Sequence, residues 1–187
     1  MSLGTRTFRT FQMRPGSGFI ASAYAVDGLA RWVRRTRPHR VLEVGCGIGT
    51  LTSILIPLLD RIHGEGQYTH VGIESDPFCL EQLRVNLGQH REKVLIVDRY
   101  ESIPTGLAPW DLLVVDGCGP YPEDGDAPLD HVLQQNRLYA SDLALHGVVF
   151  VEKDRLRQRE IIMSGLERRR VAYCHYQPSR GTPGYHI

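Results

Sequence analysis

Alternating glycines and two acids at the ends of two apolar runs are the residues best suited to hold a ligand. Residues 41–44 lead into the segment Gly45-Cys46-Gly47-Ile48-Gly49, and Glu74 closes a second apolar run, residues 71–73. Glycines let the backbone turn sharply and lie against a ligand. An ionised carboxylate can accept both hydrogen bonds of a ribose diol. The spacing therefore predicts a nucleotide-type cofactor site at the carboxyl edge of a doubly wound sheet.

The glycine spacing and a preceding acid indicate which cofactor to expect. The glycines follow the pattern G-x-G-x-G, whereas dinucleotide-binding turns have G-x-G-x-x-G. Glu43 lies just before this turn, where a carboxylate would be unfavourable beside a pyrophosphate but would suit a cationic cofactor. S-adenosylmethionine has an amine and a sulfonium, and it fits this requirement better than a nicotinamide dinucleotide. Glycine turns also join strands to helices for structural reasons alone, so Glu74 is the observation that favours the ribose role.

Strand and helix patterns alternate along the chain, which predicts the elements that position these residues. Short apolar strands between amphipathic helices indicate a parallel sheet covered on both faces. We therefore expect an α/β, doubly wound, mostly parallel seven-stranded sheet with helices on both faces and an antiparallel last strand. The expected strands are residues 40–44, 71–74, 94–97, 112–115, 148–151, 171–175 and 185–187, and the expected helices are 18–35, 51–62, 77–87, 129–143 and 154–169.

Length and composition favour one domain in a reducing compartment. The chain has 187 residues, a net charge of +1 and four dispersed cysteines without a CxxC pair. We expect an arm at residues 1–17, with a loop at 5–17, followed by a single domain at 18–187. No apolar run approaches the roughly 20 residues that span a bilayer. These features predict a cytoplasmic protein with no membrane partner, and the near-zero charge disfavours nucleic acid.

The motifs, taken in order, resemble those of the class I S-adenosylmethionine-dependent methyltransferases. The second of them, Gly72-Ile73-Glu74-Ser75-Asp76, is similar to the segment whose acid holds the ribose in that family. Matching motifs on several strands are more specific than one glycine turn. The resemblance extends from about residue 18 to the end of the chain, and its motifs are residues 41–50, 72–76, 94–101, 110–117 and 143–152.

The resemblance implies a cofactor-binding role for residues at several strand ends. The glycines would approach the cofactor through their backbone, and Glu43 would lie near the methionine amine, through water. Either Asp98 or Tyr100 would meet the adenine, because a shift of one residue exchanges them. Asp116 would lie beside the methionine and the transferred methyl group. The full implied set is Glu43, Gly45, Cys46, Gly47, Gly49, Glu74, Ser75, Asp98, Tyr100 and Asp116.

Asp116 and Gly117 are similar to the corresponding pair in the small O-methyltransferases of the catechol type. There, a divalent metal joins the substrate hydroxyls to acids after the fourth and fifth strands, which makes Asp116 and Glu152 the candidate metal ligands. Lys153 stands where the second ligand of the fifth strand would be, and an ammonium group repels a cation. A divalent metal is therefore disfavoured.

Asp116 and Lys153 are the candidate catalytic residues. Asp116 would orient the acceptor or remove its proton. Lys153 would replace the metal as the electrostatic partner of a substrate oxygen, or else pair with Glu152 or Asp154 at a helix start.

The predicted function is S-adenosylmethionine-dependent O-methylation of a small molecule. Three alternatives stay open: a methyltransferase acting on RNA or protein, a nicotinamide-dependent protein, and a non-catalytic domain that binds S-adenosylmethionine. The first depends on an arginine-rich helix at 154–170, where Glu160 and Glu167 interrupt the basic residues. A homodimer is also open, because Phe8, Phe11 and Phe19 suit either the site of their own subunit or a neighbour.

Overall fold

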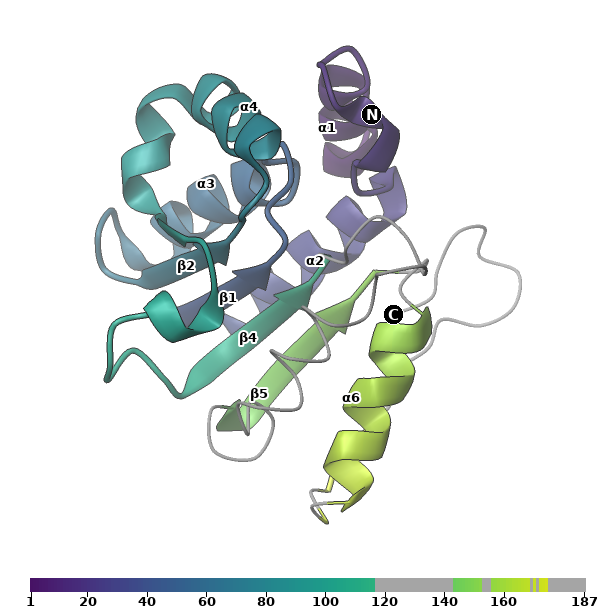
Figure 1. The fold of residues 1–187 in the computed structure, drawn as a ribbon, viewed down its shortest axis with the longest axis vertical. Helices are drawn as coiled ribbons and strands as arrows, with labels where there is room; N and C mark the ends of the chain where they lie inside the picture. Colours follow the sequence, from purple (N-terminus) through teal and green to yellow (C-terminus); the bar gives the residue numbers. More distant parts are fainter. Residues whose placement is uncertain (117–142, 153–155, 169, 171, 175–187) are drawn as a thin grey trace.

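The described strands form one parallel sheet. The computed structural model describes residues 1–116, 143–152, 156–168, 170 and 172–174. Strand order is β3-β2-β1-β4-β5, and every pairing is parallel (Figure 1). The predicted doubly wound fold is confirmed, and the winding reverses between β1 and β4. The strands are β1 (Arg40–Val44), β2 (Thr69–Ile73), β3 (Leu95–Val97), β4 (Trp110–Val115) and β5 (Leu143–Val151).

Helices cover both faces of the sheet (Figure 1). Successive strand residues point to opposite faces, so Val41 packs with Leu29 and Leu55 of two helices on one side. Leu42 packs on the other side with Ile162 of a third helix. The helices are α1 (Leu3–Phe11), α2 (Ala23–Thr36), α3 (Thr52–His63), α4 (Pro77–Leu87) and α6 (Leu156–Arg168), with 3-10 turns at Ser17–Phe19, Gly88–Lys93 and Tyr100–Ser102.

The N-terminal segment differs from the predicted loop, because residues 3–11 form helix α1. The Ser2 hydroxyl accepts a hydrogen bond from the Thr5 amide at 3.1 Å and caps the helix. Gly4, Thr7 and Phe11 are its buried residues, and their spacing places them on one face of a helix. Only one of these three is a large apolar residue, so hydrophobic periodicity did not reveal the helix. Its tertiary partner is α2, where the Asp27 carboxylate accepts from the Gly4 amide at 2.7 Å.

Other expected elements differ in extent. β5 begins at Leu143, where the sequence predicted the end of a helix; the rest of that helix, from residue 129, lies outside the described residues. Of the two last expected strands, only residues 172–174 are described, and they are not part of the five-stranded sheet. No helix in the described part of the chain is long and apolar enough to cross a membrane.

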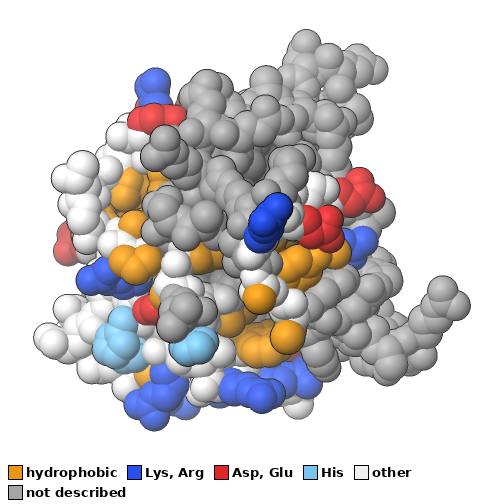
Figure 2. Space-filling model, turned by 90° about the horizontal axis from the view of Figure 1, so that it is seen from below, with side chains coloured by type: hydrophobic (Ala, Val, Ile, Leu, Met, Phe, Trp, Pro, Cys, Tyr) orange, Lys and Arg blue, Asp and Glu red, His pale blue; other side chains and the backbone are white. Residues whose placement is uncertain are grey.

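The amino edge of the sheet, away from the glycine turn, carries several basic side chains and histidines on the face seen in Figure 2. There the Asp111 carboxylate accepts hydrogen bonds from the His39 and Arg40 amides at 2.9 Å each. The ring centroids of His39 and His63 are 3.8 Å apart. Seen from below, Lys, Arg and His side chains gather along one rim of the molecule (Figure 2). Asp111 therefore joins strands at this edge and has no place in a cofactor site at the other.

Candidate functional site

The register of the strands places one residue from each strand in a row at the carboxyl edge. Val97, Ile73, Val44, Val115 and Val151 lie level across the sheet. The residue that follows each of β2, β1, β4 and β5 donates a backbone hydrogen bond to the last residue of the neighbouring strand. These bonds are Glu74 N to Val97 O at 3.0 Å, Gly45 N to Ile73 O at 2.9 Å, Asp116 N to Val44 O at 3.0 Å, and Glu152 N to Val115 O at 3.4 Å. With strands roughly 4.8 Å apart, four carboxylates flank the glycine turn, and the row is Asp98, Glu74, Gly45, Asp116 and Glu152.

The glycine turn has the backbone geometry that its sequence requires. Gly45, Gly47 and Gly49 have φ angles of 82°, 52° and 93°, in the left-handed region that L side chains rarely adopt. The Gly49 amide donates to the Cys46 carbonyl at 2.9 Å, and α3 begins directly afterwards. Among the described residues, no atom lies within 4 Å of the position that a Cβ on Gly47 would take. The surface above Gly47 is therefore open to a ligand.

Glu74 ties the glycine turn to the end of β2. Its Oε2 accepts from the Gly47 amide at 2.7 Å, and its Oε1 accepts from the Ser75 and Asp76 amides at 2.9 Å each. A carboxylate has about four lone-pair sites, so three amides leave part of its capacity for a hydroxyl group. Asp76 in turn caps α4 by accepting from the Cys79 amide at 2.8 Å. The half-buried Glu74 thus lies where a ribose acid was predicted.

Glu43 has other partners than the expected cofactor amine. Its carboxylate is fully buried, accepts from the Thr52 hydroxyl at 3.0 Å and lies 3.1 Å from His70 Nε2. A group with no accessible surface contacts neither a ligand nor a bridging water in this conformation. The structure therefore places Glu43 beneath the turn, as a support that joins β1, β2 and the start of α3.

Cys46 also points its side chain away from the open surface. It is only 4% exposed, and a Cβ on Gly72 of β2 would collide with its Sγ and with Ile96. Burial, followed by the charges of Glu43 and Glu74, raises the pKa of the Cys46 thiol well above its usual range. Cys46 can thus contribute only its backbone to the site, and Gly72 is small because this thiol packs against it.

Helix α4 supplies support that sequence reasoning missed. The Asn86 amide donates to the Ile48 carbonyl of the turn at 2.9 Å. Leu83 and Leu87, on the same helix face, come within 3.7 Å of the Cβ position of Gly49. The i, i+3, i+4 spacing of these three residues is the only local signal, and it is common to any packed helix.

The two candidate adenine contacts differ in how much they are already engaged. Asp98 accepts from the Ser102 hydroxyl at 2.7 Å and from Arg99 Nε at 2.9 Å, so both of its oxygens have partners. Arg99 and Ser102 lower the pKa of Asp98 to about 2. Tyr100 is partly buried and packs against the apolar cluster that includes Ile103. Both residues follow β3 beside Glu74, and the choice between them stays a prediction.

Asp116 and Glu152 follow adjacent strands, but Glu152 is held by another element. Its Oε1 accepts from the Ser22 amide at 2.8 Å, at the start of α2. Lys153, the other catalytic candidate, lies outside the described residues. Within the described part of the chain, no group of three His, Cys, Asp or Glu side chains could hold a metal ion.

The N-terminal segment passes over the glycine turn. Gly16 has a φ of 85°, and a Cβ there would lie 2.8 Å from Ile48 Cγ2 and from Phe78 Cε1. Ile48 belongs to the turn, and Phe78, in the first turn of α4, is 50% exposed. Residues 16–22 therefore lie against the site of their own chain, from the turn to Glu152.

No protein-family model matches the chain, and no curated protein matches it in sequence. Solved structures match it in fold. A methyltransferase from Podospora anserina, bound to S-adenosylhomocysteine, has a TM-score of 0.60 and 13% identity, over 91% of this chain and 77% of its own. The O-methyltransferase TomG from Streptomyces achromogenes, in complex with S-adenosylmethionine, gives 0.56 and 21%, over 97% and 83%. Precorrin-6y C5,15-methyltransferase from Geobacter metallireducens gives 0.56 and 16%, over 81% and 73%. The chain shares the fold of these methyltransferases, as its motifs predicted.

Proposed function

We propose that the protein is an S-adenosylmethionine-dependent methyltransferase that methylates an oxygen atom of a small molecule. The row at the carboxyl edge is the observation that supports this best. An open glycine turn lies at its centre, Glu74 on one side and Asp116 on the other. Glu74 and Asp116 are two strand spacings apart, about 10 Å, a distance that a nucleoside with an amino-acid tail can bridge.

The charge of the edge favours a cationic cofactor over a dinucleotide. Asp98, Glu74, Asp116 and Glu152 follow four of the five strands, and Asp98 is paired with Arg99. A pyrophosphate across the turn would bring two more negative charges to this edge. A sulfonium and an amine would instead be attracted to it. The Podospora anserina methyltransferase, bound to S-adenosylhomocysteine, and TomG, bound to S-adenosylmethionine, support this preference.

The residues of the chain would mainly align and deprotonate the acceptor. When bound, S-adenosylmethionine would supply the methyl group of its sulfonium for transfer to the acceptor oxygen and would leave as S-adenosylhomocysteine. Asp116, at the end of β4, would orient the acceptor hydroxyl and take its proton. Lys153 would stabilise negative charge on the acceptor oxygen. Glu74 would hold the ribose, and Glu43 would keep the turn in place from beneath.

A divalent metal does not fit the described donor set. Asp116 and Glu152 are the two carboxylates nearest the expected position, and one Glu152 oxygen is already bonded to the Ser22 amide. A magnesium site needs near-octahedral oxygen ligands, and two carboxylates, one of them partly engaged, supply too few. We therefore assign no step to a metal.

The kind of cofactor is tested by calorimetric titration. S-adenosylhomocysteine should bind with a dissociation constant in the micromolar range, a value on the order of −8 kcal/mol. NADH should not bind under the same conditions. Glu74→Gln should weaken S-adenosylhomocysteine, while Glu81→Gln, an exposed glutamate paired with Arg84, serves as the matched control. Binding of NADH alone would overturn the proposal.

The reaction is tested by following transfer of a labelled methyl group to a panel of phenols. For the acceptor that is found, Asp116→Asn should lower kcat by about a hundredfold or more and leave S-adenosylhomocysteine affinity within about threefold of the wild type. Activity should not change with magnesium or a chelator. Tight cofactor binding without turnover on phenols, amines, RNA or protein would instead identify a non-catalytic domain.

A further inference from the structure

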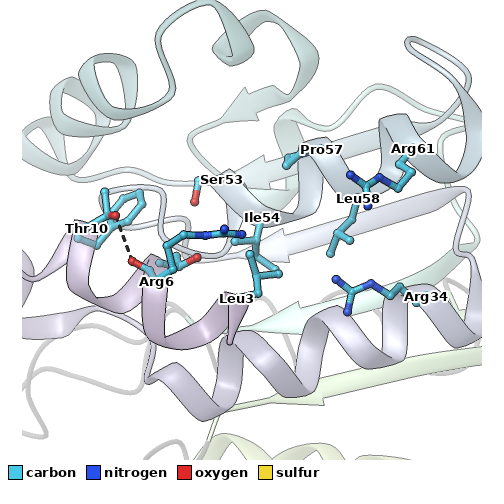
Figure 3. A pocket seen from close by; sticks show the side chains of 11 residues that line it. Leu3, Arg6, Thr10, Arg34, Ser53, Ile54, Pro57, Leu58 and Arg61 are labelled. Carbon is cyan, nitrogen blue, oxygen red and sulfur yellow. Dashed lines mark hydrogen bonds between the residues drawn. The ribbon is translucent and has the colours of Figure 1, made fainter. Parts of the chain in front are cut away.

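A groove between three helices on one face of the sheet is lined by three arginines and several apolar side chains. It has a volume of about 460 Å³ and lies between α1, α2 and α3. Arg6, Arg34 and Arg61 come from one helix each, and Leu3, Ile54 and Leu58 are among the apolar lining residues (Figure 3). None of the residues assigned to the cofactor site lines it. The volume lies within the range of roughly 300–1,000 Å³ that small-molecule sites occupy.

The three guanidinium groups have no acidic partner among the described residues. No Asp or Glu is among the described residues that line the groove. Within the described part of the chain, no ion pair or side-chain hydrogen bond joins Arg6, Arg34 or Arg61 to another residue. In Figure 3, Arg6 extends from α1 toward Ile54, and Arg34 and Arg61 lie toward the other end of the groove, on either side of Leu58. Three like charges facing one groove repel each other, and an anion between them removes that repulsion.

Helix dipoles explain only part of this arrangement. Arg34 and Arg61 lie in the last turns of α2 and α3, where cations are favourable in any protein. Arg6 lies in the middle of α1 and has no such role. A dipole role also does not require an apolar floor, whereas Leu58, only 6% exposed, and Ile54, 4% exposed, form one here.

We propose that this groove binds a small amphiphilic anion, with a phosphate monoester between the arginines and an apolar body over Ile54 and Leu58. A phosphate monoester has a charge of about −1.5 to −2 at neutral pH and three acceptor oxygens. It therefore matches several guanidinium groups better than a carboxylate, which has one charge and two oxygens. The apolar floor selects a ligand with a hydrocarbon part over free phosphate. This site is independent of the methyltransferase assignment.

The test is a titration of the full chain with hexyl phosphate, compared with inorganic phosphate and with hexanol. Hexyl phosphate should bind at least about tenfold more tightly than either, because it alone uses both parts of the groove. Amide chemical shifts should change at Thr7 and Ser53, which line the groove, and not at Glu74. Saturating S-adenosylhomocysteine should not displace it.

A pair of charge-matched variants assigns the binding to this groove. Arg34→Gln/Arg61→Gln should weaken hexyl phosphate by about tenfold or more. Arg9→Gln/Arg14→Gln removes the same charge from exposed positions outside the lining and should change the affinity less than twofold. If the first double variant melts at a lower temperature, the single variants Arg34→Gln and Arg9→Gln repeat the comparison.

Three results would overturn the proposal. One is the absence of hexyl phosphate binding, and another is equal loss of affinity in the two double variants. The third is equal affinity for hexyl and inorganic phosphate, which would mean an adventitious ion only. Loss of retention on RNA or on anionic vesicles in Arg34→Gln/Arg61→Gln, without binding of hexyl phosphate, would replace the proposal by a polyanion surface.

Discussion

Two glycines of the same turn allow the cofactor site to be tested against backbone strain. Gly47 and Gly49 both have left-handed backbone angles, with φ of 52° and 93°. Their surroundings differ. A Cβ on Gly47 would enter open space, whereas a Cβ on Gly49 would meet Leu83 and Leu87 at 3.6–3.7 Å, an ordinary packing distance. Alanine at either position therefore strains the backbone, but only at Gly47 does it occupy the space assigned to the ligand.

The magnitudes follow from these two environments. A residue with a Cβ costs roughly 1–2 kcal/mol in the left-handed region, so both Gly47→Ala and Gly49→Ala should lower the free energy of unfolding by about that amount. For a domain of this size each kcal/mol lowers Tm by about 2–4 °C. Gly47→Ala should in addition weaken S-adenosylhomocysteine by about tenfold or more, which equals roughly 1.4 kcal/mol. Gly49→Ala should bind it within about threefold of the wild type.

The assay is thermal unfolding without ligand, followed by calorimetric titration with S-adenosylhomocysteine well below both melting temperatures. Comparing the two variants separates loss of the fold from loss of the site, because their strain is similar. Wild-type affinity in Gly47→Ala would refute the placement of the ligand above the turn. An equal loss of affinity in Gly49→Ala would mean that the turn as a whole is distorted, and that the open space above Gly47 has no special role.

Three further predictions concern the carboxylates of the same edge. Glu74→Gln should lower cofactor affinity by about tenfold, because the single amide oxygen cannot accept from three N–H groups and a diol. Titration calorimetry measures the change in affinity. The pKa of Asp98 is lowered to about 2, so its stabilising contribution is complete above the pKa of the unfolded state, near 4, and is lost as the pH falls toward 2. An NMR titration of the Asp98 carboxyl should show a midpoint near the lowered pKa, and Arg99→Gln should raise that pKa. Glu152→Ala should leave the Ser22 amide unbonded and cost about 1–3 kcal/mol, and a Tm equal to that of the wild type would contradict this role.

The local sequence predicted an element correctly where the residues that start and end it lie within or next to that element. α4 runs from Pro77 to Leu87 as predicted, because Asp76 caps it and Pro77 suits its first position. The apolar runs of β1 and β2 identified central strands in the same way. β5 was predicted too short, since its first residues, from Leu143, pair with β4 around an irregularity near Trp110. Such pairing depends on a strand distant in the sequence, so the local hydrophobic pattern does not predict it.

The sequence determines where the candidate site residues lie in the fold more directly than it determines which way their side chains point. The positions of Gly47 and Glu74 follow from strand ends and turn chemistry, which the local sequence determines. The surroundings of Glu43 do not, because His70, 27 residues away, and Thr52 bury it. A carboxylate beside a glycine turn can face the ligand or the interior, and only the packed structure distinguishes the two. The role expected for Glu43 beside the cofactor amine therefore stays a prediction, and in this conformation its carboxylate faces Thr52 and His70.

The contact between Glu152 and Ser22 explains why the N-terminal segment belongs in any account of the site. It joins residues 130 positions apart, and Gly16 lies against Ile48 of the turn only a few residues earlier. Both contacts come from one stretch of chain, so residues 16–22 connect the end of β5 with the cofactor turn. A ligand that takes Oε1 of Glu152 must compete with the Ser22 amide. A ligand that lifts the segment from Ile48 acts on the same stretch of chain that leads into α2. Binding at this edge and the placement of the N-terminal segment are therefore coupled. The effect of single substitutions at Glu152 and in residues 16–22 on ligand affinity would measure this coupling.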